Sequence, residues 1–150
     1  MSTIKRFEDL EVWKLARELC QEVYQLTLQN GFSKDFGLKD QINNSSGSVM
    51  DNIAEGFERD GSKEFSQFLS ISTGSCGECR SQLYRAFDRS YISAEQFELL
   101  SQKTIDLGRK ISNLMVYLKN SEMKGNKFKA SHPQTQSPER QQEQHKQRET

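Results

Sequence analysis

Apolar residues recur every three or four positions through most of the first 120 residues, which is the spacing of one face of an α-helix. Four such segments are separated by short polar stretches. In chain order their inward positions are Val12, Leu15, Ala16, Leu19, Val23 and Leu26; Leu38, Ile42, Ser45, Val49, Ile53 and Gly56; Phe65, Phe68, Leu69, Ser72, Cys76, Cys79, Leu83, Ala86 and Phe87; and Phe97, Leu100, Thr104, Leu107, Ile111, Leu114 and Leu118. Short links make neighbouring helices antiparallel, and this rhythm favours crossing angles of about 20°. The pattern therefore predicts an all-α, up-down-up-down four-helix bundle.

The helix boundaries follow from local signals. Asn30-Gly31 is a stop signal after the first segment, and Gly61-Ser62 precedes the third. Ser93 and Gln96 have the spacing of a capping box before the fourth. Residues 43–48 of the second segment are poor helix formers, although the inward positions stay in phase through them. We expect one continuous helix there, with a break as the alternative.

The composition changes near residue 120. From residue 121 onward the only apolar residues are Met123, Phe128 and Ala130, and the same stretch holds both prolines of the chain. Such a segment buries too little apolar surface to offset the entropy of ordering. We expect a four-helix bundle over residues 1–120 and a disordered, polar, Gln-rich tail over residues 121–150.

Charge and hydropathy narrow the function classes. Lys plus Arg (21) equals Asp plus Glu (21), which argues against a strongly basic nucleic-acid binder and leaves only a local patch. No run approaches the roughly 18 apolar residues of a membrane span. The first residues carry charges with no apolar segment behind them, so no signal peptide is expected. The sequence predicts a cytoplasmic protein without membrane contact.

Few residues of the predicted bundle are of the types that catalyse reactions or bind metals. Both histidines, His132 and His145, lie in the expected tail, so the bundle offers no histidine base or ligand. Cys76 and Cys79 have the spacing of a redox or zinc motif, but they lie in the middle of a helix and in phase with its apolar series, where cysteine acts as a small hydrophobe. We predict a non-enzymatic protein with no catalytic residue, metal or cofactor.

Basic residues offer one candidate surface. On the third segment Lys63, Arg85 and Arg89 share one angular sector, and Arg85 and Arg89 are one helical turn apart, suited to neighbouring phosphates. The alternative is an ordinary solvated face, because acids lie between them. The full set of candidate nucleic-acid contacts is Lys39, Arg59, Lys63, Arg85, Arg89, Arg109 and Lys110.

The first segment carries a second apolar stripe beside its inward one. Its members are Leu10, Trp13, Cys20, Tyr24 and Leu28. A helix in a single bundle needs one buried stripe, and aromatic residues on a second face are typical of subunit contacts. The stripe indicates an oligomer interface, with a wider core as the alternative.

Many short motifs occur together along residues 7 to about 120. They are Phe7-Glu8-Asp9-Leu10, Val12-Trp13, Val23-Tyr24, Leu26-Thr27, Phe36-Gly37-Leu38, Gln41-Ile42, Asn52-Ile53-Ala54-Glu55-Gly56, Arg59, Ser62, Glu64-Phe65, Phe68-Leu69, Ile71, Gly74-Ser75, Glu78 and Tyr91-Ile92. In these motifs the chain resembles the bacterial four-helix bundle proteins of the 23S rRNA intervening-sequence family, which are related to the accessory variability protein of diversity-generating retroelements. The resemblance implies a small helical bundle, commonly a homopentamer, without catalysis.

For the retroelement relatives, the resemblance also implies binding of nucleic acid and of a reverse transcriptase through a basic surface. Asn43 and Asn44 stand where the family usually carries a basic pair after Gln-Ile. Two hypotheses follow. The first is a homo-oligomeric accessory protein that binds RNA or DNA, and the second is a protein-interaction scaffold that binds no nucleic acid.

Overall fold

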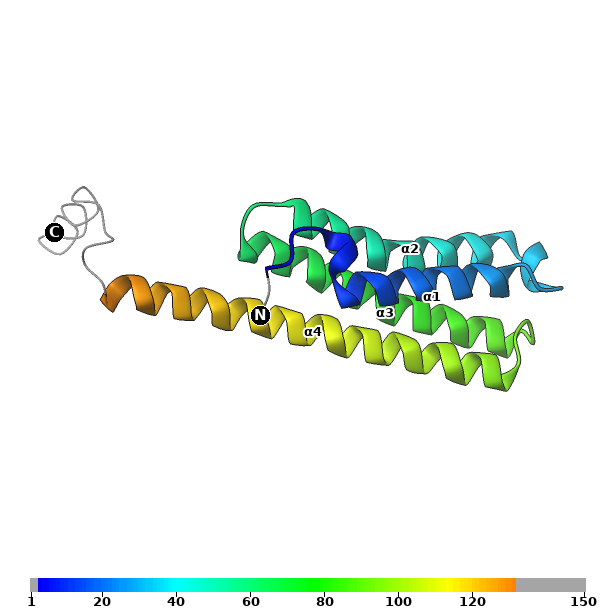
Figure 1. The fold of residues 1–150 in the computed structure, drawn as a ribbon. Coiled ribbons are helices and arrows are strands. Elements are labelled where there is room, and N and C mark those ends of the chain that lie inside the picture. Colours follow the sequence, from blue (N-terminus) through cyan, green and yellow to red (C-terminus); the bar gives the residue numbers. More distant parts are fainter. Residues whose placement is uncertain (1–2, 132–150) are drawn as a thin grey trace, which may run out of the picture.

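Helices make up the whole of the chain's regular structure between residues 3 and 131, the part that this computed structural model describes, with side chains described up to residue 121. The long helices are α1 (Glu11–Thr27), α2 (Phe36–Glu58), α3 (Ser62–Asp88) and α4 (Ala94–Ser131) (Figure 1). Two single-turn 3-10 helices, η1 (Phe7–Asp9) and η2 (Phe32–Lys34), precede α1 and α2. The predicted all-α class is confirmed.

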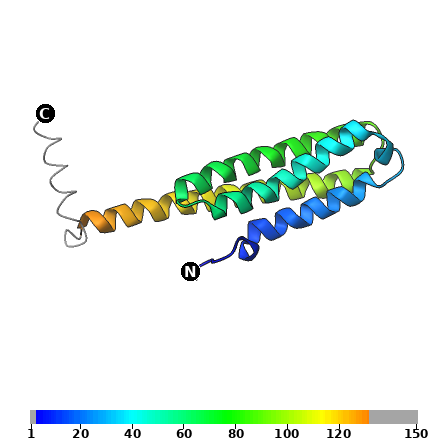
Figure 2. The same cartoon turned by 90° about the horizontal axis from the view of Figure 1, so that it is seen from above.

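The four helices run up and down in sequence order, as predicted. Figures 1 and 2 show α1 beside α2, α2 beside α3, and α4 returning along the side of α1. Side-chain contacts close this cycle of neighbours: Cys20 to Ser46 (α1 to α2), Ser45 to Gln82 (α2 to α3), Arg80 to Thr104 (α3 to α4) and Lys103 to Glu22 (α4 to α1). The face between α1 and α2 is therefore opposite the face between α3 and α4.

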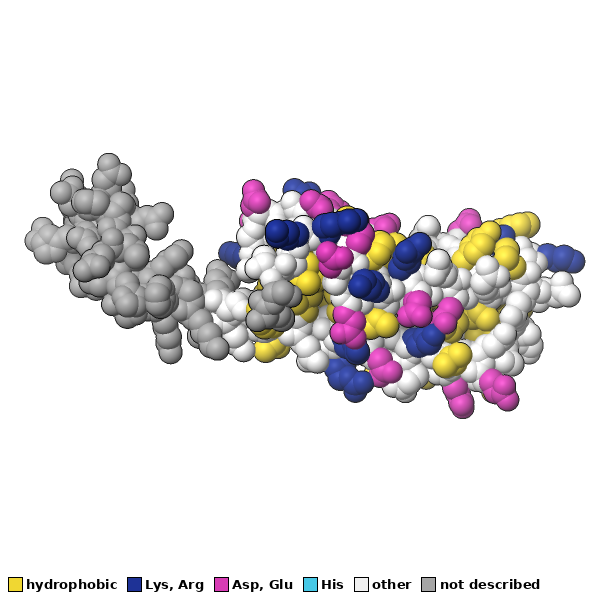
Figure 3. All heavy atoms as spheres, viewed as in Figure 1, with side chains coloured by type: hydrophobic (Ala, Val, Ile, Leu, Met, Phe, Trp, Pro, Cys, Tyr) yellow, Lys and Arg dark blue, Asp and Glu magenta, His cyan; other side chains and the backbone are white. Residues whose placement is uncertain are grey.

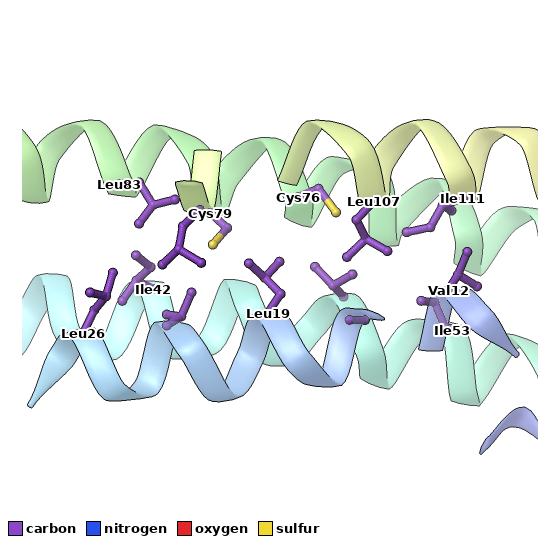
Figure 4. Close-up of a cluster of buried hydrophobic side chains, with 14 of the residues drawn as sticks. Val12, Leu19, Leu26, Ile42, Ile53, Cys76, Cys79, Leu83, Leu107 and Ile111 are labelled. Carbon is purple, nitrogen blue, oxygen red and sulfur yellow. The ribbon is translucent and has the colours of Figure 1, made fainter. Parts of the chain in front are cut away.

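The predicted inward positions form the core. Figure 4 shows side chains from all four helices meeting along the bundle axis. Leu15 and Phe68 are half-buried at its margin, and Phe87 is exposed because α3 ends one residue later. The rest of the predicted series on α1, α2 and α3 is buried, as are Leu100, Thr104, Leu107 and Ile111 on α4.

The middle of α2 is a continuous helix despite its poor helix formers. Its serines replace side-chain packing with hydrogen bonds to α3. The buried Ser45 Oγ donates to Gln82 Oε1 at 2.6 Å, and Ser72 Oγ of α3 donates to the carbonyl of Val49 at 3.0 Å. Small side chains let the two backbones approach closely, and tertiary contacts outweigh the low intrinsic propensity. The alternative of a helix break is excluded.

Helix ends follow the predicted signals. Gly31 and Gly61 adopt positive φ of 86° and 108°, which glycine adopts without steric cost. The capping box is present: the Gln96 amide donates to Ser93 Oγ at 3.1 Å, and the Ser93 amide donates to Gln96 Oε1 at 3.0 Å.

Helix α4 ends later than the predicted domain boundary at residue 120. It continues to Ser131, because the sequence presents no proline until Pro133. Residues 132–150 of the predicted tail lie outside the described residues. Among the described helices, none is long and apolar enough to cross a membrane.

Candidate interaction surfaces

The predicted second stripe of α1 divides into two parts. At its start, Leu10 is buried, and the Trp13 ring packs edge-on against Phe7 with 5.1 Å between ring centroids. Cys20 is half-buried, with its sulfur 4.0 Å from the Ser46 hydroxyl of α2. The fold itself uses these three residues, as the wider-core alternative expected.

The second part of the stripe faces solvent. Tyr24 is 51% exposed and Leu28 49%, and Phe36 in the first turn of α2 is 70% exposed. We call these three residues the α1–α2 patch. In Figure 3, hydrophobic side chains gather at the right-hand end of the molecule, where α1 ends and α2 begins. Phe36 falls outside the period of the core positions on α2, so the hydrophobic pattern does not indicate it as part of a surface.

A second apolar patch lies on the opposite face. Tyr84 of α3 is 53% exposed and Ile105 of α4 43%, and Phe87 is also exposed. The ring of Phe97 joins Tyr84 and Phe87, with centroid separations of 4.6 Å and 5.1 Å. We call Tyr84, Phe87 and Ile105 the α3–α4 patch. No sequence signal singled it out, because its members come from two helices and Phe87 was assigned to the inward series of α3.

Both patches lie toward the same end of the bundle. The connection from α1 to α2 meets the connection from α3 to α4 there: Asp35 Oδ2 accepts from Tyr91 at 2.9 Å and from Arg89 at 2.7 Å, and Phe32 stacks on Tyr91 at 5.5 Å. The Tyr91 hydroxyl, the Leu38 amide and the Arg89 guanidinium hold the pKa of Asp35 below its ordinary value, and the Asp35 carboxylate raises the pKa of Tyr91. This cluster fixes the connection end.

The predicted basic residues do not form one surface. Lys63 and Arg85 share an angular sector of α3, but they are 22 residues apart, which at 1.5 Å per residue is about 33 Å along the helix. Lys63 and Arg59 lie at the α2–α3 corner, whereas Lys39, Arg85 and Arg89 lie at the connection end. The prediction of one basic surface used the angular position of these residues around α3 and did not consider their distance along the helix axis.

Most of these cations already have partners within the chain. Arg85 donates to Gln41 Oε1 at 2.6 Å. The ion pairs are Arg59 with Glu55 at 3.0 Å, Arg89 with Asp35 at 2.7 Å, Arg109 with Asp106 at 2.7 Å and Lys110 with Glu11 at 2.5 Å. Figure 3 accordingly shows Lys and Arg side chains interspersed with Asp and Glu on the visible face. Lys39, Lys63 and Arg85 of the predicted set form no ion pair among the described residues, because the partner of Arg85 is the neutral amide of Gln41.

The cysteine pair belongs to the core, as interpreted from its position. Cys76 and Cys79 are buried, and burial raises the pKa of the Cys76 thiol to about 11 and that of the Cys79 thiol to about 12. At neutral pH both remain protonated, and the thiol is a poor nucleophile. The pair therefore contributes packing.

A groove of about 810 Å³ opens at the other end of the bundle. Its walls are the segment before α1, the α2–α3 corner and α4, and its apolar lining includes Ile4, Phe57, Phe65, Leu114 and Leu118. It forms because α1 begins only at Glu11, so the inward face of α4 beyond Ile111 is only partly covered, and Leu114 and Leu118 are half-buried there.

Comparisons with known proteins add a family and a fold. A family model described as 23S rRNA-intervening sequence protein matches residues 8–113. The structure is similar to a crystal structure from Bacteroides thetaiotaomicron, described as a protein with unknown function from the S23 ribosomal protein family. The TM-score is 0.63 at 21% identity, over 69% of this chain and 97% of that chain, which shows the shared fold. No curated protein matches the chain.

Proposed function

Because the chain belongs to the 23S rRNA-intervening sequence protein family, we propose that it works by binding, as a non-enzymatic, homo-oligomeric bundle that acts as a protein-interaction scaffold in the cytoplasm. The exposed apolar patches carry this proposal. Large apolar side chains gathered on opposite faces of one small bundle are typical of contact surfaces. The buried, protonated thiols of Cys76 and Cys79 support the non-enzymatic part.

Self-association is tested by measuring the mass in solution. Sedimentation velocity at tens of micromolar protein should give a multiple of the 17.3 kDa chain, and the resemblance to the family favours five copies. A strict monomer at that concentration would contradict the proposal. Capture of partners from the native host after nuclease treatment then separates the scaffold from a nucleic-acid binder, because a scaffold keeps its partners without RNA or DNA.

Nucleic-acid binding is the second candidate, and one observation favours it. Lys39, Arg85 and Arg89 lie near the same end of the bundle, so an oligomer repeats this group once per subunit. Repetition compensates for the small number of unpaired cations in one chain. An associated reverse transcriptase belongs to this candidate through the retroelement relatives.

The salt dependence of binding tests this candidate. Affinity for structured RNA or duplex DNA should fall steeply with rising salt, because each phosphate contact releases counterions. Arg85→Gln should weaken binding and reduce that slope. Lys63→Gln, on the same helix about 33 Å away, is the charge-matched control and should leave binding unchanged. If wild-type protein shows no binding at low salt, the candidate is eliminated.

A further inference from the structure

The last turns of α4 extend past the ends of the other three helices, at the end of the bundle where α2 and α3 join (Figures 1 and 2). We call residues 119–131 the α4 extension. It lies beyond residues 8–113, the part of the chain that matches the family model. A helix that projects into water gains little from packing, and Asn120, Gly125 and Asn126 lower its intrinsic propensity. A neighbouring helix would therefore stabilise this segment.

The inward apolar series of α4 continues into the α4 extension. From Leu114 and Leu118, the same spacing of three and four residues leads to Ser121, Gly125 and Phe128. These five positions lie within a sector of about 80° at about 100° per residue. The two small residues permit a close approach of a second helix, and the aromatic residue offers apolar area to bury. The α4 extension thus has a face suited to packing against another helix.

The groove of about 810 Å³ lies at the base of this face. Leu114 and Leu118 line it together with Ile4, Phe57 and Phe65. Of these five residues only Phe65 is fully buried, so the groove keeps apolar area that is open to solvent. A helix that entered from beyond the end of the bundle would cover the apolar side chains that α1, which begins only at Glu11, leaves exposed.

Charge favours a second copy of the α4 extension as the helix that enters. The α4 extension carries four lysines and one acid, whereas the groove walls (residues 3–12, 55–65 and 110–118) carry seven acids and five bases. Net charges of opposite sign favour the contact. The wall residues without an ion pair among the described residues are the acids Asp9, Glu58, Asp60 and Glu64 and the bases Lys5 and Lys63. Residues 132–150 of the chain contain no apolar side chain apart from two prolines, so they do not suit an apolar groove.

We propose that the α4 extensions of two copies pack antiparallel, each one in the groove of the other copy. This inference rests on the self-association proposed above and names one contact for it. In an antiparallel pair the inward positions of the two helices meet in reverse order, so Ser121 opposes Gly125 of the second copy and Phe128 opposes Leu118. Because Leu118 lines the groove, Phe128 of the second copy enters it. The contact is two-fold symmetric and involves the same residues of both copies.

Replacing the aromatic residue of the α4 extension tests this contact. Phe128→Asp would place a charge in the apolar groove. Since a two-fold contact joins two equal halves, we expect this variant to halve the mass of the wild-type assembly. Met123→Asp introduces the same charge about 180° around the helix from Leu114 and should leave the mass unchanged. Sedimentation velocity at tens of micromolar protein measures the mass, and circular dichroism verifies that both variants are folded.

The same measurement separates this contact from self-association in general. A monomeric wild type refutes both proposals. A wild-type oligomer whose mass is unchanged in Phe128→Asp refutes only the contact between α4 extensions. Halving of the mass by Met123→Asp would also refute it, because the effect would then not depend on the face of the helix that carries the charge.

Disulfide trapping tests the antiparallel register. With oxidised glutathione as oxidant, an equimolar mixture of the Ser121→Cys and Gly125→Cys variants should give more covalent dimer than either variant alone. In each single variant the two new cysteines lie about 6 Å apart along the helix axis, whereas in the mixture they face each other. Val116→Cys mixed with Gly125→Cys is the control, because Val116 is 58% exposed on the outer side of α4.

Non-reducing electrophoresis measures the covalent dimer, and wild-type protein treated in the same way accounts for the three native cysteines. A Ser121→Cys and Gly125→Cys mixture that cross-links no more than the Val116→Cys control contradicts the contact. Single variants that cross-link as well as the mixture contradict the antiparallel register.

Discussion

The α2–α3 seam and the α1–α4 seam join neighbouring helices in different ways. Between α2 and α3, buried serines form hydrogen bonds, and Gly56 lies so close to α3 that an added Cβ would be 2.6 Å from the Phe68 Cβ. Between α1 and α4, the polar side-chain links among the described residues are the ion pairs Lys103–Glu22 and Lys110–Glu11. The first seam fixes register and distance, and the second leaves grooves.

The two seams also differ in whether their buried polar atoms have hydrogen-bond partners. Across the α2–α3 seam, Ser45, Ser72 and Gln82 each have a hydrogen-bond partner. In the α1–α4 seam, Glu22 Oε2 is buried and has no partner among the described residues. Removing a buried partner costs more free energy than removing an exposed ion pair. We therefore expect the polar contacts between α2 and α3 to contribute more to stability than the ion pairs between α1 and α4.

The largest loss of stability should come from adding a side-chain atom where α2 and α3 lie closest together. Gly56→Ala forces its Cβ against Phe68 and the Phe65 backbone, and we expect it to lower the unfolding free energy by about 2 kcal/mol through overpacking. Gly47→Ala in the same helix meets nothing within 4 Å and should raise stability by about 0.5–1 kcal/mol. Urea denaturation of both variants measures the difference. Equal changes in unfolding free energy for the two variants would contradict the close packing of Gly56 against α3.

Loss of a buried hydrogen bond should have the next largest effect. Ser45→Ala leaves Gln82 Oε1 without its donor and should cost about 1–2 kcal/mol of unfolding free energy. Ser81→Ala, at an exposed position of α3, is the matched control, and it should be neutral or slightly stabilising. A neutral Ser45→Ala would show that the seam does not depend on this bond.

The Asp35 cluster makes part of the stability depend on pH. Its folded-state pKa is lowered, so its contribution is present above the ordinary Asp value of 3.8 and is lost as pH falls through the folded pKa. Asp35→Asn should lower stability at pH 7, and the gap to wild type should shrink in acid. Urea denaturation at several pH values measures this gap. A constant gap across the acid range would contradict the lowered pKa.

The smallest effects belong to the α1–α4 ion pairs. Lys103→Gln and Lys110→Gln should each change the unfolding free energy by about 0.5 kcal/mol or less, because all four side chains of these pairs are more than a third exposed to solvent. High salt should abolish the effect by screening. Denaturation at low and high salt measures it. A loss of unfolding free energy as large as that expected for Ser45→Ala would show that the α1–α4 ion pairs contribute as much to stability as the α2–α3 hydrogen bonds.

Angular positions were predictable, because rotation along a helix is a local property of about 100° per residue. The positions of Ser45, Ser72 and Gly56 in the core and the core interpretation of Cys76 and Cys79 follow from it. The capping box follows from the identity and spacing of Ser93 and Gln96. Partners across the bundle were not predictable in this way. Lys110 meets Glu11 99 residues away, so its pairing depends on how distant helices align.

The same distinction applies to the candidate surfaces: the angular position of a residue on its helix was predictable, but its burial by other elements was not. The stripe on α1 was correctly placed by angle, but burial by η1 and by α2 removed Leu10, Trp13 and Cys20 from its exposed part. The α3–α4 patch combines residues of two helices and becomes evident only when these are packed. The axial separation of Lys63 and Arg85, about 33 Å along one helix, by contrast follows from their spacing in the sequence and was predictable.

The length of α4 has a consequence for everything attached beyond it. From Leu118 to Ser131 the helix rises about 20 Å, at 1.5 Å per residue. The end of α4 therefore lies beyond the bundle, at the end remote from the connection that the Asp35 cluster holds. A protein domain fused directly after Ser131 would start away from both apolar patches.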